Sequence, residues 1–224
     1  MTEGYDFHGI FTELHTLCNS DLSAFYFEIR KDRLYCDAAD SVERRACRTV
    51  MNEVYKRLTA WLAPILAFTA EEAWQARVQD IENSVHLRIY DPIPDGWLDP
   101  ALGERWAGIR QVRQVVTTAL EAARNDGAIG ASLQAAPVVH VDAARAELFA
   151  GEDAAALFIT SDAQITTDAA PADAFRVEGI ENAAVAFATA DGGKCARCWK
   201  IMPEVTSEDG ICNRCDDVVN AAAG

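Results

Sequence analysis

Two Cys-x-x-Cys pairs near the end of the chain constrain its folding more than any other feature. They are Cys195 with Cys198 and Cys212 with Cys215, and thirteen residues separate the pairs. A gap of two residues lets each pair turn both sulfurs towards one point, and four thiolates around one point suit a tetrahedral zinc ion. The sequence therefore predicts one structural zinc ion, Zn2+, held by these four cysteines in a small ribbon.

Three other uses of the four cysteines stay open at this point: two disulfides, a thioredoxin-like redox pair, and an iron–sulfur site. A redox Cys-x-x-Cys usually occurs singly, after a strand of an α/β fold. A ligand set made only of cysteines does not separate zinc from iron. No histidine lies nearby as a further ligand, so we expect a closed site without a catalytic role.

The remaining cysteines, Cys18, Cys36 and Cys47, are scattered through segments with helical patterns. We expect them to be buried, reduced thiols. Reduced thiols together with zinc are typical of the cytoplasm. No apolar run approaches the roughly 18 residues that span a membrane. The sequence thus predicts a cytoplasmic protein without a membrane partner, and we expect it to be a monomer.

The first 127 residues carry apolar side chains at helical spacing. One stripe repeats every four residues from Val42 to Leu62, and another runs from Trp106 to Ala123. Pro64 is expected to stop the first of these helices, and residues 99–100 (Asp-Pro) to start the second. These patterns predict a helical bundle over residues 1–127.

Beyond Gly127 the pattern changes to short strands and an Ala-rich, acidic composition. We expect strands at residues 137–141, 157–159 and 184–188, and a short helix after Asp142. These elements predict a small α+β junction module over residues 128–193, followed by the zinc ribbon and tail over residues 194–224. The predicted fold class is therefore mainly α, with a helical bundle, a small α+β junction module and a C-terminal zinc ribbon.

Several local predictions belong to this scheme. Polar residues 19–21 predict a break between two helices, and residues 69–72 predict a capping box at the start of a helix. Residues 84–87 are expected to be extended. The last nine residues are expected to fray.

The net charge of −15 argues, taken alone, against a polyanionic partner. The charges are unevenly distributed, however. Residues 1–127 hold 14 Lys and Arg against 20 Asp and Glu, whereas residues 128–193 hold 2 against 10. Because binding to a phosphate backbone depends on local clusters, both ends of the chain stay candidates for contact with nucleic acid.

Catalytic motifs are absent from the sequence. It contains no Gly-rich phosphate loop, no nucleophile elbow and no cluster of histidines with carboxylates. We therefore predict no catalytic residues.

Several stretches together carry a family resemblance: residues 22–26 (LSAFY), 31–35 (KDRLY), 44–45 (RR), 61–74 (WLAPILAFTAEEAW), 84–87 (SVHL), 130–135 (GASLQA) and 194–199 (KCARCW). They closely resemble the anticodon-binding domain, junction and zinc ribbon of bacterial isoleucyl-tRNA synthetases. The helical motifs alone also fit the valyl and leucyl relatives. The terminal ribbon joined to the bundle is what favours the isoleucine family.

The resemblance implies a C-terminal part of a larger isoleucine-tRNA ligase. The family's catalytic core, with its His-Ile-Gly-His and Lys-Met-Ser-Lys-Ser type motifs, and its editing domain do not occur in this sequence. We therefore expect no ligase activity from this chain alone, and we expect the missing domains to be its partners. An N-terminal helix of the bundle is expected to be missing as well.

In that family this part is expected to hold the anticodon stem-loop of isoleucine tRNA, while ATP and isoleucine react in the catalytic core. Cations meet stem phosphates, and aromatic rings stack on splayed loop bases. The predicted tRNA-binding residues are Arg30, Lys31, Arg33, Arg44, Arg45, Arg48, Arg197, Trp199 and Lys200. For Trp199 the alternative is that its ring packs the core of the ribbon. Arg110 and Arg113 are weaker candidates.

Two other functions stay open. The first is a stand-alone adaptor whose zinc ribbon and acidic module bind protein instead of RNA. The second is the end of a DNA-repair glycosylase, a family that also closes with a Cys-x-x-Cys ribbon, although the bundle motifs have no place there.

Overall fold

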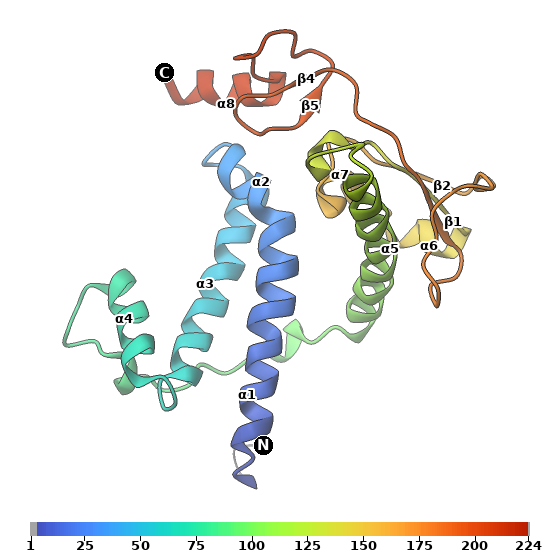
Figure 1. Ribbon diagram of the computed structural model, residues 1–224. Helices are drawn as coiled ribbons and strands as arrows, with labels where there is room; N and C mark the ends of the chain where they lie inside the picture. Colours follow the sequence, from blue (N-terminus) through green and yellow to red (C-terminus); the bar gives the residue numbers. More distant parts are fainter. Residues whose placement is uncertain (1–3, 224) are drawn as a thin grey trace. The chain divides into compact units, whose positions relative to one another are not determined.

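The computed structural model describes residues 4–223 (Figure 1). Its contacts divide the chain into two compact units. Unit 1 combines Met1–Ala38 with Pro100–Gly224, and unit 2 is Ala39–Asp99. The domain limits expected above, 1–127, 128–193 and 194–224, concern parts that fold on their own and stay predictions.

Unit 1 begins with helical turns that follow one another without a gap. They are α1 (Phe7–Thr16), the π-helical segment η2 (Leu17–Phe27) and α2 (Glu28–Cys36). The break predicted at residues 19–21 is therefore wrong. Those polar residues lie within η2, where Asp21 accepts a hydrogen bond from Arg110 at 2.7 Å instead of ending a helix.

The core of unit 1 is built on α5 (Pro100–Asn125), as the stripe from Trp106 to Ala123 predicted. Ile109, Val112 and Val116 on this helix are fully buried, and Trp106 packs at the edge of the same cluster. The helix packs against a sheet of three strands (Figure 1). Burial of this stripe is what joins the helical part to the junction segment.

The three-stranded sheet has β1 (Val138–Val141) at its centre, flanked by β2 (Gln164–Thr166) and β3 (Ala183–Ala186). Strand β1 runs parallel to β2 and antiparallel to β3, with Val139 opposite Ile165 and Val185. Parallel neighbours need a crossover. Two short helices, α6 (Ala143–Leu148) and α7 (Ala154–Phe158), lie in this crossover. The strand predicted at residues 137–141 is confirmed over Val138–Val141, and so is the helix after Asp142. The strand predicted at residues 184–188 is present but spans Ala183–Ala186, so it ends two residues earlier than predicted.

The strand predicted at residues 157–159 is wrong. Leu157 and Phe158 close helix α7, and Ile159 turns the chain with a φ of 59°. The Asp153 carboxylate caps this helix by accepting from the Ala156 amide at 3.0 Å. A run of three apolar residues suits a buried helix end as well as a strand, and the preceding alanines and the cap decide for the helix.

The ribbon closes the chain. Strands β4 (Gly193–Lys194) and β5 (Ile201–Met202) form an antiparallel pair, and helix α8 (Asn213–Ala223) follows the second cysteine pair. The fraying predicted for the last nine residues is wrong for residues 216–223, which are helical, and residue 224 lies outside the described residues. The 3-10 turn η5 (Ser132–Gln134) precedes β1.

Unit 2 contains α3 (Val42–Leu62), α4 (Ala67–Val78) and the 3-10 turns η3 (Val85–Leu87) and η4 (Asp95–Trp97). Its small core gathers around Trp74, whose ring stacks on Tyr55 with 6.0 Å between centroids. Val85–Leu87 form the 3-10 turn η3 with Ser84 as its N-cap, so the extended conformation predicted for residues 84–87 is wrong.

Two further predictions for unit 2 are corrected. Helix α4 begins at Ala67, so residues 69–72 do not form its cap; the Glu71 carboxylate instead accepts from Ser84 and from the Val85 amide, each at 2.8 Å. On α3, Val42 and Val50 are 74% and 45% exposed, so the predicted stripe is not buried along its whole length. The helix contacts its core through its C-terminal half.

The predicted fold class is confirmed: helices dominate, a small mixed sheet follows, and a cysteine cluster closes the chain. Among residues 4–223, no helix combines the length and the apolar character that crossing a bilayer requires.

Candidate metal centre and the adjoining surface

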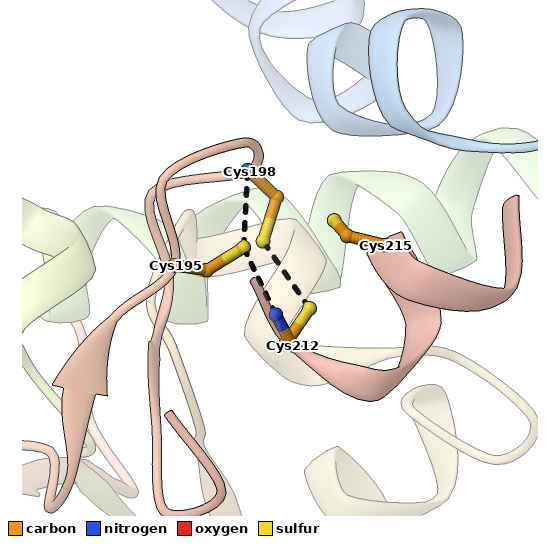
Figure 2. A group of neighbouring side chains, drawn as sticks. All are labelled: Cys195, Cys198, Cys212 and Cys215. Carbon is orange, nitrogen blue, oxygen red and sulfur yellow. Dashed lines mark hydrogen bonds between the residues drawn. The ribbon is translucent and has the colours of Figure 1, made fainter. Parts of the chain in front are cut away.

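The four predicted cysteines converge in the ribbon (Figure 2). Their sulfur atoms all lie within 4.8 Å of one another, and the sulfurs of Cys198 and Cys212 are 3.8 Å apart. A tetrahedral ion with bonds of about 2.3 Å to sulfur would place its ligands about 3.8 Å apart. A disulfide needs about 2.0 Å, and the structure has these cysteines as free thiols. The cluster therefore fits one metal ion and not two disulfides.

Backbone turns explain why the sulfurs face one point. In the first knuckle, residues 195–200, the Trp199 amide donates to the Cys195 carbonyl at 2.9 Å, and the Cys195 amide donates to the Lys200 carbonyl at 2.8 Å. The amides of Cys198 and Cys212 point at the Cys195 sulfur, at 3.5 and 3.3 Å. Cys212 and Cys215 lie at the start of α8, where unpaired helix N–H groups favour negative charge.

The pKa values of the cysteine thiols indicate which of them ionise without a bound metal ion. Burial opposes ionisation of Cys195, but the amides of Cys198, Cys212 and Arg197 outweigh burial and lower its pKa to about 6. Burial raises the pKa of Cys198 and of Cys212. Only a bound cation would therefore bring all these sulfurs to the thiolate form at neutral pH, with release of protons.

Two arginines of the ribbon form contacts with the C-terminal part of α2. Arg197 Nη1 donates to the Cys36 carbonyl at 2.6 Å and lies 3.6 Å from the Cys215 sulfur. Arg214 donates to both carboxylate oxygens of Asp32, at 2.6 and 2.7 Å. Burial opposes ionisation of Asp32, but the hydrogen bonds and charge of Arg214 outweigh it, so the pKa of Asp32 falls below its usual value.

A cavity of about 470 Å³ lies between α2, α7, the turn at residues 131–133 and the first knuckle. Its walls are mostly apolar. Two aromatic residues that line it, Tyr35 and Trp199, are 75% and 61% exposed. Because Trp199 is so exposed, its ring does not form the core of the ribbon. Lys194 Nζ lies 5.6 Å from the centre of that ring.

The predicted tRNA-binding residues fall into three groups. Lys31, Arg197, Trp199 and Lys200 line the cavity together. Arg33 is engaged in ion pairs with Asp37 at 3.6 Å and with Asp153 at 2.9 Å. The remaining four lie on two helices. Arg30 is half-buried on α2, whereas Arg44, Arg45 and Arg48 lie on α3 in unit 2, with Arg45 and Arg48 exposed.

The weaker candidates on α5 are occupied within unit 1. Arg110 pairs with Asp21, and Arg113 donates to the Leu157 carbonyl at 2.9 Å. Both guanidinium groups also lie over the Phe25 ring, at 4.6 and 5.5 Å from its centre.

Sequence reasoning missed several residues of this surface. Tyr35 belongs to a stretch that carried the family resemblance, yet no role was predicted for it. The sequence carries one signal for Arg214: an arginine precedes the second cysteine of each Cys-x-x-Cys pair. It carries none for its partner Asp32.

Comparison with known proteins agrees with the resemblance. Residues 1–140 match the family described as the anticodon-binding domain of tRNA ligase. The chain is 46% identical to the isoleucine–tRNA ligase of Gluconobacter oxydans over 223 residues, which is 98% of this chain and 22% of that protein. It is 50% identical to the one from Ruegeria pomeroyi over 216 residues, 95% of this chain and 22% of that protein.

The chain spans about a fifth of the length of these curated relatives. The family match covers well over half of the chain itself. The chain therefore belongs to the family of tRNA ligase anticodon-binding domains.

Proposed function

We propose that this chain binds the anticodon stem-loop of isoleucine tRNA as part of an isoleucine–tRNA ligase, with ATP-dependent aminoacylation carried out by domains outside this chain. Its family and the names of its relatives support a tRNA-binding role. The observation that carries the proposal is the cavity beside the ribbon, where Tyr35 and Trp199 lie exposed near Lys31 and Lys200.

The chemistry of that surface suits single-stranded RNA. Splayed bases stack on aromatic rings, and each stacked base contributes about 1–3 kcal/mol. The cavity volume of about 470 Å³ falls within the range of about 300–1,000 Å³ typical of small-ligand pockets, so it can take a base with part of its ribose. Lys31 and Lys200 would meet the adjoining phosphates, and Arg30 supplies a further cation on α2.

Residues on α3 form a second part of the proposal. Arg45 and Arg48 are exposed one helical turn apart, with Arg44 beside them. We assign them to the phosphates of the anticodon stem. Because they belong to unit 2, their contribution is tested independently of the cavity.

We propose zinc as the metal of the four-cysteine site. Thiolate ligands select zinc or iron, and a closed tetrahedral site with no open position suits structural zinc. When bound, the ion supplies folding free energy to a ribbon whose own core is small. Protein purified without chelator should contain one zinc per chain and no iron, as measured by elemental analysis. Iron at one equivalent would overturn the assignment.

The role of Trp199 is tested with a fluorescently labelled anticodon stem-loop of isoleucine tRNA. Trp199→Ala should weaken binding by roughly 5-fold to 150-fold, which corresponds to one lost stacking contact. Trp199→Phe is the matched control, because it keeps an aromatic face and should retain most of the affinity. Equal affinities for the wild type and Trp199→Ala would contradict the proposal.

Salt dependence separates this function from the alternative of a protein-binding adaptor, which the acidic segment 128–193 favours. A binder making six phosphate contacts should lose about three orders of magnitude in affinity between 50 and 200 mM salt. A weak response that is the same for isoleucine tRNA and any other tRNA would favour the adaptor. We further propose that the partners of this chain are the catalytic and editing domains of the same ligase. We also propose that the chain is a monomer.

A further inference from the structure

We propose that Arg197 and Arg214 form a two-point clamp that seats the metal-bound ribbon on the last turn of α2, so that metal binding fixes Trp199 beside that helix. The two arginines are positioning residues and do not contact tRNA. Only the RNA-binding part of the inference rests on the function proposed above.

The clamp begins with the placement of the arginines in the sequence. Each is the residue immediately before the second cysteine of its pair, Cys198 and Cys215. A metal ion that holds both pairs at one point therefore also fixes the two arginine backbones relative to each other. Without the ion, a gap of more than a dozen residues would leave the two arginines independent.

Arg197 uses one kind of contact. The last carbonyls of a helix lack partners within it, and Arg197 donates to two of them, Cys36 at 2.6 Å and Tyr35 at 3.4 Å. A cation at this position also complements the negative end of the helix dipole. Arg197 therefore caps α2 from the ribbon, across 161 residues of chain.

Arg214 uses another kind of contact. Its two terminal nitrogens meet the two oxygens of Asp32, a bidentate geometry that fixes direction as well as distance. The side chains of Arg214 and Asp32 are 33% and 28% exposed, so solvent screens the pair only in part. Two contacts of different geometry prevent the ribbon from rotating on the end of α2.

The contacts continue into α7. Asp37 accepts from Arg214 at 3.4 Å and lies 3.6 Å from Arg33, whose other nitrogen pairs with Asp153 at 2.9 Å. Asp153 is the N-cap of α7. Helix α2, helix α7 and the first knuckle are the same segments that line the cavity, so the cavity exists in this form only while the ribbon is seated.

This assignment changes the role expected for two predicted tRNA-binding residues. The guanidinium groups of Arg197 and Arg33 are directed at protein carbonyl, carboxylate and sulfur atoms. Trp199 and Lys200 lie directly after Cys198 and stay at the cavity. In this assignment Arg197 and Arg33 bind protein atoms, whereas Trp199 and Lys200 contact the RNA.

The test is hydrogen–deuterium exchange of the full chain with one metal ion bound, read on peptides covering residues 30–38. Arg214→Gln should raise exchange at the last turn of α2 by about ten-fold, the loss expected for one charged hydrogen-bonded contact. Asp32→Asn should do the same, although it leaves the ribbon sequence intact. Arg124→Gln is the matched control, because Arg124 forms an exposed ion pair with Glu121 on α5.

Two further results are expected. Removing the metal from the wild type with a chelator should raise exchange at residues 30–38 as the variants do, and adding zinc back should restore protection. Exchanging the charges, Asp32→Arg together with Arg214→Asp, should recover part of the protection in the metal-loaded protein. Unchanged exchange at residues 30–38 in metal-loaded Asp32→Asn would overturn the clamp.

Binding of the anticodon stem-loop gives the second readout. If Arg214 acts by positioning Trp199, the effects of Arg214→Gln and Trp199→Ala should be less than additive in a double-mutant cycle. Fully additive losses would assign Arg214 a separate contact with RNA and overturn its positioning role. If the stem-loop binds neither the wild type nor any variant while the exchange results are as expected, the proposed function is rejected and the clamp is still supported.

Discussion

Trp199 adopts a backbone conformation that bulky residues rarely take, with a φ of 68°. Such a conformation costs about 1–3 kcal/mol and persists where the surrounding structure determines it. Here the Trp199 amide is bound to the Cys195 carbonyl, which closes the turn around the sulfur cluster. The ribbon thus holds a large ring at its surface, where it contributes little to the ribbon's own core.

Removal of one sulfur tests the metal site directly. Cys212→Ser should release the metal and unfold residues 194–216, because metal binding supplies most of the folding free energy of so small a segment. The core around Ile109 and Val139 should stay folded, since it is built without the ribbon. Elemental analysis and amide exchange measure the two effects. A full equivalent of metal in this variant would contradict the four-ligand assignment.

Gly193 is the second single position with a large expected effect. A methyl group there would overlap the Val205 carbonyl oxygen, which belongs to the backbone and has little freedom to move. Gly193→Ala should therefore weaken zinc binding, as measured by competition with a chelator. The control is Gly103→Ala, in an open position on α5, which should leave zinc binding unchanged and stabilise the helix by up to about 1 kcal/mol. Equal zinc affinity in both variants would show that β4 can shift.

The elements that sequence patterns predicted best are those whose burial follows one period. Helix α5 and strand β1 bury the residues that their periodicity selected, because each faces a single core. The predictions failed where distant contacts decide. Residues 19–21 stay helical with Asp21 bound to Arg110, 89 residues away, and Glu71 supports the turn at Val85 instead of a cap.

The candidate site likewise contains residues that the sequence predicted and residues that it did not. Spacing alone located the four cysteines, because a metal site repeats one local turn twice. The cavity, Tyr35 and the Asp32–Arg214 pair depend on contacts between segments up to 182 residues apart, and no periodicity encodes them.

Helix α3 carries an ion pair with a pH dependence of known sign. Hydrogen bonds from Arg57 and from Lys56 lower the pKa of Glu53 from 4.5 to about 2. A pKa lower in the folded than in the unfolded protein means that the pair stabilises α3 fully above about pH 4.5 and loses this effect as the pH falls towards 2.

Glu53→Gln should therefore increase hydrogen exchange in α3 at pH 6, and the difference from the wild type should vanish near pH 2. Arg57 also lies over the Trp97 ring, at 4.8 Å, so its own position should persist in the variant. Glu121→Gln on α5 is the control and should leave α3 unchanged at every pH. A difference that grows on acidification would show that Glu53 acts through something other than its charge.

The chain as a whole consists of two compact units that share no apolar cluster. Unit 1 contains the cluster around α5 and the one around the four cysteines, and unit 2 contains the cluster around Trp74. Cores that share no residues generally unfold as separate transitions. Calorimetry should accordingly resolve the unfolding of unit 2 from that of unit 1, and a chelator should leave the unit 2 transition unchanged. A single transition that shifts as one on chelation would indicate that the two cores unfold together.

The pairing of Asp32 with Arg214 has a consequence for biosynthesis. At about 5–20 residues per second, a ribosome adds the 182 residues between them in roughly ten to forty seconds. During this interval the carboxylate of Asp32 and the open end of α2 have no partner from the ribbon. The nascent helix end thus stays available to chaperones until the last cysteine has been translated and the ion has been captured.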